Sequence, residues 1–268
     1  DFSRRSKILW FGLQFAENLL DYKMDNDRKR EPAMSIQEHV DAVRANIAAA
    51  AQAAGRDPEE ITLCAATKVQ TDETIRAAVA AGITVCGENR VQELTAHLAA
   101  NAYQGAQVHF IGHLQTNKVK QVVGKVALIH SVDSQRLLQA IETQAGRLGL
   151  VQDILLEVNI AGEESKGGCT PGQARELAQL AQELEHVRLR GLMAIPPISQ
   201  EPGANRPFFA AMRQLFVDIK GKMSHNQSNM DCLSMGMSGD YPDAIAEGAT
   251  LVRVGTALFG PRPPMHRA

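Results

Sequence analysis

The chain has 268 residues, of which 28 are basic and 30 acidic, and its formal net charge at pH 7 is −2. This balance argues against nucleic acid or an anionic membrane as the main partner, because both are bound through clustered positive charge. Hydrophobic residues make up 44% of the chain, which is enough apolar material for one substantial core, and no apolar run approaches the ~20 residues of a membrane span.

Residues 1–33 are predicted to be an N-terminal extension, and residues 34–268 the folded domain. Arg4, Arg5 and Lys7 precede an apolar stretch that imitates a targeting signal, but polar residues interrupt it and no small-residue cleavage site follows. Regular helical patterning begins only at Ser35, so Met34 is the expected functional beginning. An amphipathic N-terminal helix is the alternative.

Helices and strands alternate along the rest of the chain. A leading helix is predicted over 35–54, where Ile36, Val40, Val43 and Ile47 recur at helical spacing. Eight apolar runs read as strands, at 61–68, 83–89, 107–112, 127–133, 152–160, 187–195, 231–237 and 251–256. Seven helices are predicted between them, at 71–81, 90–100, 116–123, 134–148, 171–184, 208–223 and 242–248.

This alternation predicts an α/β fold. Strands that are apolar along their whole length are buried on both faces, as parallel strands are. Eight of them separated by helices indicate a single (β/α)8 TIM-type barrel with an extra leading helix. An open flavodoxin- or Rossmann-like sheet is the alternative, weakened because no GxGxxG motif follows the first strand.

The four cysteines are predicted to be reduced thiols of a cytoplasmic protein. They are scattered without CxxC spacing, and three of them fall in predicted strands. No metal site is expected from them. His109 and His113 are not expected to share a metal either, because residues four apart on a strand lie ~13 Å apart.

Lys68 is the most informative residue, because it ends the first predicted strand. The carboxyl ends of barrel strands form the functional face, and an amine there suits a Schiff base to a carbonyl compound. His113, at the end of the third strand, is expected to line the same pocket, with His109 in the core. Polar and glycine residues at the other strand ends support one shared site.

The loops after the last two strands are phosphate-binding candidates. Their glycines let the backbone approach an anion closely, and Ser238 and Thr256 add hydroxyl groups. An amine beside a phosphate site is the arrangement that pyridoxal 5′-phosphate (PLP) needs. Arg253, expected to share an inward face with Gly255, could donate to the pyridine nitrogen; alternatively it pairs with Glu157 or Asp231.

Six segments resemble a known family. They are Thr67-Lys68, Gly87 to Glu93, His109 to Lys118, Arg190 to Ile195, Leu233 to Ser238 and Arg253 to Gly260. Together they resemble the pyridoxal phosphate homeostasis protein family, also called the YggS-like or proline synthetase co-transcribed family. The resemblance covers about Ser35 to Pro261, nearly the whole chain after the N-terminal extension.

The resemblance implies an alanine-racemase-like (fold type III) barrel with PLP held as an internal aldimine on Lys68. The other implied cofactor contacts are Asn89, Met193, Ser238, Arg253, Gly255 and Thr256, with Arg253 at the ring nitrogen. The implied role is in vitamin B6 and amino-acid or keto-acid homeostasis, by storing PLP or delivering it to PLP-dependent apo-enzymes, without an established catalytic reaction.

Two enzyme classes are alternatives. An amino-acid racemase needs a second acid/base opposite the lysine, and none of the three tyrosines, Tyr22, Tyr103 and Tyr241, has a convincing position. A Schiff-base aldolase acting on a sugar phosphate would use a lysine and a phosphate site, but its lysine is usually on a middle strand. No dimer-forming domain follows the barrel, so a monomer is expected.

Overall fold

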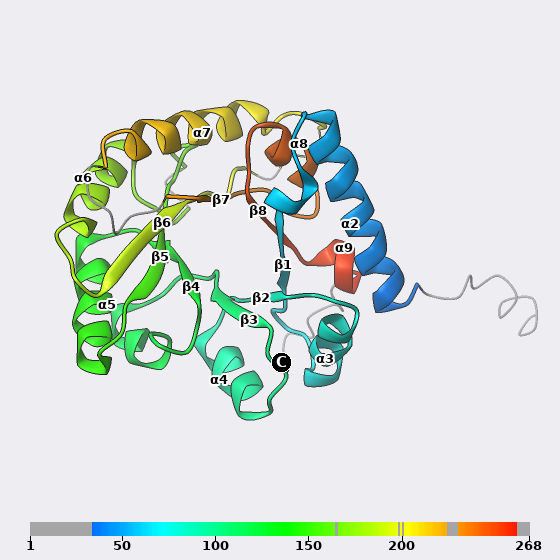
Figure 1. Cartoon of the computed structure of the whole chain (residues 1–268), viewed down its shortest axis with the longest axis horizontal. Helices are drawn as coiled ribbons and strands as arrows, with labels where there is room; N and C mark the ends of the chain where they lie inside the picture. The colour runs from blue at the N-terminus through cyan, green and yellow to red at the C-terminus, as the bar shows by residue number, and fades with distance from the viewer. Residues whose placement is uncertain (1–33, 164–165, 198, 200, 224–229, 262–268) are drawn as a thin grey trace, which may run out of the picture. The chain divides into compact units, whose positions relative to one another are not determined.

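The computed structural model describes residues 34–163, 166–197, 199, 201–223 and 230–261. Within them, eight parallel strands form a closed barrel in the order β1 to β8, and helices surround it (Figure 1). The predicted (β/α)8 barrel is confirmed. The predicted extension, residues 1–33, lies outside the described residues.

Each strand lies within a predicted range. The strands are Thr62–Ala66 (β1), Val85–Glu88 (β2), Gln107–Phe110 (β3), Leu128–Val132 (β4), Gln152–Glu157 (β5), Val187–Met193 (β6), Cys232–Ser234 (β7) and Leu251–Val254 (β8). Pairing of β1 with β8, with Cys64 opposite Arg253, closes the barrel. The predictions ran too far at the carboxyl ends, most clearly at β7, where Gly236 turns the chain with a φ of 89°.

The helices cover the outside of the barrel. They are Ile36–Ala53 (α2), Asp72–Ala80 (α3), Val91–Ala99 (α4), Gln135–Leu148 (α5), Pro171–Ala181 (α6), Arg206–Lys220 (α7), Tyr241–Ala246 (α8) and Thr256–Phe259 (α9), with 3-10 turns at Pro58–Glu60 (η1) and Thr116–Gln121 (η2). The leading helix α2 packs against α8 and α9. In the described part of the chain, no helix is both long and apolar enough to cross a bilayer.

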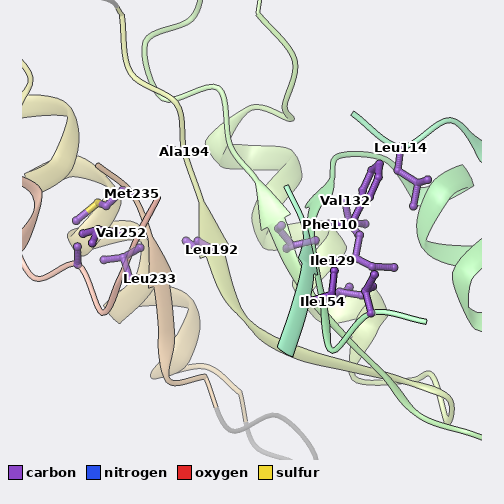
Figure 2. Close-up of a cluster of buried hydrophobic side chains, with 14 of the residues drawn as sticks. Phe110, Leu114, Ile129, Val132, Ile154, Leu192, Ala194, Leu233, Met235 and Val252 are labelled. Atoms are coloured by element: carbon purple, nitrogen blue, oxygen red, sulfur yellow. The ribbon is translucent and has the colours of Figure 1, made fainter. Parts of the chain in front are cut away.

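The main hydrophobic core lies between the strands and the surrounding helices. Residues such as Phe110, Ile129, Ile154 and Leu233 belong to this layer, part of which Figure 2 shows. The inward-facing layer is more polar, because His109, His130, Ser234 and Arg253 are buried there beside two small apolar clusters. The barrel therefore offers polar groups along its axis.

The four cysteines are free, and all but the half-buried Cys232 are buried. Burial raises the pKa of Cys86, Cys169 and Cys232 to about 12, and it raises the pKa of Cys64 as well. These thiols are therefore protonated at neutral pH.

Candidate functional site

A cavity of about 240 Å³ opens at the carboxyl ends of the strands. Its lining includes Lys68, Asn89, Ser238, Arg253, Gly255 and Thr256. These are six of the eight residues predicted from the sequence to contact a cofactor. They come from the ends of β1, β2, β7 and β8, so the closed barrel brings together residues that are nearly 190 positions apart in the chain. We call this space the carboxyl-terminal cavity.

A tight turn after β1 positions Lys68. Thr67 is fully buried, and its carbonyl oxygen accepts the N–H of Gln70 at 3.1 Å. Val69 lies in the left-handed region with a φ of 63°, which a β-branched residue rarely adopts. Strain of this kind costs on the order of 1–3 kcal/mol and is concentrated at functional sites. The turn thus fixes the backbone next to the lysine.

A buried carboxylate ties the ends of β1 and β2 together. Glu88 is fully buried, and its Oε1 accepts the hydroxyl of Thr67 at 2.6 Å and the hydroxyl of Tyr103 at 3.0 Å. Nδ1 of His97 lies 3.0 Å from the same oxygen. Because Thr67 precedes the lysine and Glu88 precedes Asn89, this network holds two residues of the cavity side by side.

Asn89 presents an unused acceptor at the cavity. Its Oδ1 is buried and has no hydrogen-bond partner among the described residues. A buried amide oxygen without a donor is costly, typically by ~1–3 kcal/mol. The arrangement therefore suits a ligand that carries a hydrogen-bond donor.

The last two loops meet at Ser238. Its Oγ accepts the backbone N–H groups of Gly255 and Ala257, each at 3.2 Å. Gly236 makes the preceding turn, since a Cβ there would lie 2.6 Å from Ala244 Cβ. Asp240 fixes the loop by accepting the Met237 N–H at 2.7 Å. Backbone N–H groups and a hydroxyl thus converge where phosphate was predicted.

Arg253 is held by neutral acceptors. Its Nη1 donates to the carbonyl and hydroxyl oxygens of Ser234 at 2.9 and 2.5 Å, and Nη2 donates to Ala194 O at 2.9 Å. The alternative pairing with Asp231 is wrong, because that carboxylate binds Arg190 at 2.6 Å. No ion pair between Arg253 and Glu157 occurs among the described residues either.

Comparison with known proteins agrees with this geometry. The family profile described as "Alanine racemase, N-terminal domain" matches residues 39–263. A pyridoxal phosphate homeostasis protein of Aquifex aeolicus (strain VF5) is 43% identical over 229 residues, which cover 85% of this chain and 99% of that protein. The chain belongs to the pyridoxal phosphate homeostasis protein family. The predicted resemblance is therefore confirmed.

Further relatives agree with the assignment to the pyridoxal phosphate homeostasis protein family. The Escherichia coli (strain K12) protein of that name is 38% identical over 230 residues, covering 85% of this chain and 97% of its own length. PipY of Synechococcus elongatus PCC7942, solved with PLP bound, is 36% identical with a TM-score of 0.72, over 84% of this chain and 100% of PipY. Alanine racemase of Clostridium difficile 630 has a TM-score of 0.64 but 15% identity, over 86% of this chain and 57% of its own, and so shares the fold alone.

Two predicted residues lie away from the carboxyl-terminal cavity. His113 is exposed and lines a separate depression with Asp133 and Arg136. β3 already ends at Phe110, so the strand direction no longer determines where His113 points. Met193 is fully buried and packs with Leu155 in the barrel. The geometry brings neither residue into the lining of the cavity.

Sequence reasoning missed part of the site. Gln70, Ile111, Ile195 and Phe259 also line the cavity. The network around Glu88 was missed too, because His97 and Tyr103 come from α4 and the loop that follows it. The sequence does contain one signal for this network. Glu88 lies inside a segment predicted to be a buried strand, and a buried carboxylate needs hydrogen-bond partners.

Proposed function

We propose that this protein binds PLP in the carboxyl-terminal cavity and holds it as a Schiff base on Lys68. The observation that carries the proposal is the common cavity shared by the lysine, the Ser238–Thr256 loops and Arg253. The names of the relatives and the PLP in PipY support it. The unused Oδ1 of Asn89 adds an acceptor to which a ring substituent could donate.

Each residue has a separate task in this proposal. Bound PLP supplies an aldehyde that condenses with an amine, and Lys68 is the amine at this site. Ser238, Thr256 and the backbone N–H groups of their loops bind the phosphate. Arg253 donates to the pyridine nitrogen. His113 and Met193 are left out, because neither lines the cavity.

The proposed position of the arginine also favours a role in homeostasis over a role in catalysis. A guanidinium is charged at all ordinary pH values, so it disfavours a proton on the neighbouring pyridine nitrogen. An unprotonated pyridine is a poor electron sink, which restrains carbanion chemistry. We therefore infer that the protein stores PLP or delivers it to PLP-dependent apo-enzymes. We expect it to act in the cytoplasm, as a monomer.

An amino-acid racemase remains the alternative. It would need a second acid/base on the face opposite the lysine. Tyr103 and Tyr241 are both buried, and neither lines the cavity. Tyr103 donates to Glu88, and burial raises its pKa above the usual range, so it is a poor proton acceptor. Isotope exchange at the α-carbon of alanine would reveal racemase chemistry.

The test is an absorbance spectrum of the purified protein with added PLP, before and after borohydride reduction. We expect a visible band that disappears on reduction and leaves a pyridoxyl label, which peptide mapping locates on Lys68. Absence of a band with saturating PLP would overturn the proposal, and a label on another lysine would overturn the assignment to Lys68.

A further inference from the structure

A chain of hydrogen bonds crosses the interior of the barrel from the carboxyl-terminal cavity. It runs from Arg253 Nη1 to Ser234 Oγ (2.5 Å), from there to His130 Nδ1 (3.1 Å), and from His130 Nε2 to His109 Nδ1 (3.0 Å). All four side chains are at least 95% buried. They come from β8, β7, β4 and β3, so the chain joins opposite walls of the closed barrel.

The far end of this chain lies at the other mouth of the barrel. His109 lines a cavity of about 920 Å³ with residues near the amino ends of the strands, among them Asp153, Arg190 and Asp231. We call it the amino-terminal cavity. Nδ1 of His109 is used by His130, and Nε2 makes no hydrogen bond to any described residue. That nitrogen is the last atom of the hydrogen-bond chain.

Arg253 gives the chain a direction. A guanidinium only donates, so the oxygen of Ser234 accepts from it. The hydroxyl proton of Ser234 then has His130 Nδ1 as its acceptor within the described residues. A neutral imidazole carries one N–H, so His130 donates from Nε2 to His109 Nδ1, and His109 keeps its N–H on Nε2.

Both histidines are neutral at physiological pH, as this direction requires. Burial and the neighbouring His109 and Arg253 hold the pKa of His130 well below its usual value. Burial, followed by the charge of Arg190, lowers the pKa of His109 to about 4. A proton on His130 would make both ring nitrogens donors and remove the acceptor that the Ser234 hydroxyl uses.

The hydrogen-bond chain supplies one of the acceptors that orient the guanidinium. Two of its three acceptors are main-chain carbonyl oxygens, and Ser234 Oγ is the side-chain acceptor. A bidentate carboxylate would fix the plane of a guanidinium by itself, but none binds Arg253 in the described structure. The rotamer of Ser234, set by His130, therefore takes part in fixing that plane.

We propose that Ser234, His130 and His109 are positioning residues that hold Arg253 toward the ring nitrogen of the cofactor. The proposal rests on the proposed function, because it requires PLP in the carboxyl-terminal cavity. Ser234 and His130 would act on the cofactor only through the guanidinium. Their effect should therefore appear in the spectrum of bound PLP as well as in affinity.

The test compares four single variants, and the Ser234→Ala/His130→Leu double variant, by the dissociation constant for PLP and by the visible absorbance band of the bound cofactor. Ser234→Ala removes the acceptor, and His130→Leu removes the group that orients it. His130→Asn is the conservative variant, since its carbonyl oxygen can accept near the position of Nδ1. Leu155→Ala is the control, because it creates a cavity in the same barrel interior at a residue that is not part of the hydrogen-bond chain.

We expect Ser234→Ala and His130→Leu each to weaken PLP binding about tenfold and to shift the visible band. The double variant should be no worse than either single one, because the residues act as one unit. His130→Asn should restore the wild-type band, and Leu155→Ala should lower thermal stability without moving it.

Two results would count against the proposal in different ways. If wild-type protein gives no band, the proposed function fails and the inference fails with it. If wild-type protein gives the band and His130→Leu matches both wild type and Leu155→Ala in affinity and spectrum, the inference alone is overturned. Thermal unfolding of each variant without PLP identifies any that does not fold, in which case Ser234→Ala, the smaller change, decides.

Discussion

The two mouths of the barrel differ in how their charged side chains and buried polar atoms are paired. At the amino-terminal cavity, Arg190 binds Asp153 at 2.7 Å and Asp231 at 2.6 Å, and Arg188 binds Asp153 at 2.6 Å. At the carboxyl-terminal cavity, Asn89 leaves a buried amide oxygen unpaired.

The amino-terminal cavity is larger, about 920 Å³ against 240 Å³, yet its charged groups already neutralise one another. Cavity volume alone therefore does not identify the candidate site.

Replacement of the lysine should give the largest effect on binding. Lys68→Ala removes the amine, so PLP keeps only its noncovalent contacts, and we expect affinity to fall at least about a hundredfold, or ~3 kcal/mol. Borohydride should then leave no pyridoxyl label. Lys120→Ala, on the exposed side of η2, is the matched control and should bind like wild type. Covalent labelling of the Lys68→Ala protein at wild-type yield would contradict the assignment.

Acid should destabilise the protein because it favours protonation of His109, which is neutral in the folded barrel. The pKa of His109 is about 4 in the folded protein, below its ordinary value of 6.5, because burial disfavours the charged form. The unfolded chain therefore binds the proton first, and the free energy of unfolding falls as the pH drops from 6.5 toward 4. The loss is on the order of 3 kcal/mol.

Urea unfolding at several pH values between 4 and 7 measures this loss. His109→Asn removes the titrating group, so its unfolding free energy should change less over the same window, whatever its value at neutral pH. An identical pH dependence in the variant and in wild type would show that His109 is not the source.

A substitution at the amino-terminal cavity should affect stability without affecting binding. Arg190→Gln leaves Asp231 without its partner and Asp153 with Arg188 alone. We expect a cost of about 1 kcal/mol in the free energy of unfolding and a PLP affinity within about twofold of wild type. A tenfold change in PLP affinity would contradict the expectation that the amino-terminal mouth contributes to stability alone.

At the phosphate loops the expected loss of PLP affinity is smaller than at Lys68. Ser238→Ala removes a hydroxyl that accepts two backbone N–H groups, and we expect PLP to bind roughly tenfold more weakly, a change of ~1.4 kcal/mol. Ser134→Ala is the matched control, because Ser134 also accepts a backbone N–H, at the start of α5. It should lower stability by ~1 kcal/mol and leave PLP binding unchanged. Equal affinities for the two variants would remove Ser238 from the site.

The sequence predicts the barrel because its strands are buried on both faces. Apolar runs such as 152–160 are typical of buried strands, and their alternation with helices favours the closed barrel. The helix predicted over 116–123 is a 3-10 turn, Thr116–Gln121, because apolar spacing in so short a segment does not separate the two helix types. Strand ends are less predictable, since β7 ends at a turn that only the conformation of Gly236 reveals.

The site is predictable at the strand ends and immediately after them, where the direction of the strand still determines the course of the backbone. The pattern predicts Lys68 and Gly255 at strand ends and Arg253 on an inward face, and the structure places all three in the lining of the carboxyl-terminal cavity. His113 lies further beyond the end of its strand, since β3 ends at Phe110, and it lines a separate depression. The cross-barrel contact of Ser234 with His130 joins residues 104 positions apart, and no local pattern encodes it.

The buried cysteines have a consequence for chemical selectivity. Aldehydes are electrophiles for sulfur as well as for nitrogen, and the thiolate is the reactive form of sulfur. Because burial raises the pKa of the Cys86 and Cys232 thiols to about 12, both are protonated at neutral pH. The protonated thiols in the barrel wall are therefore poor nucleophiles. An aldehyde at the carboxyl-terminal mouth would react with an amine there without competition from the described thiols.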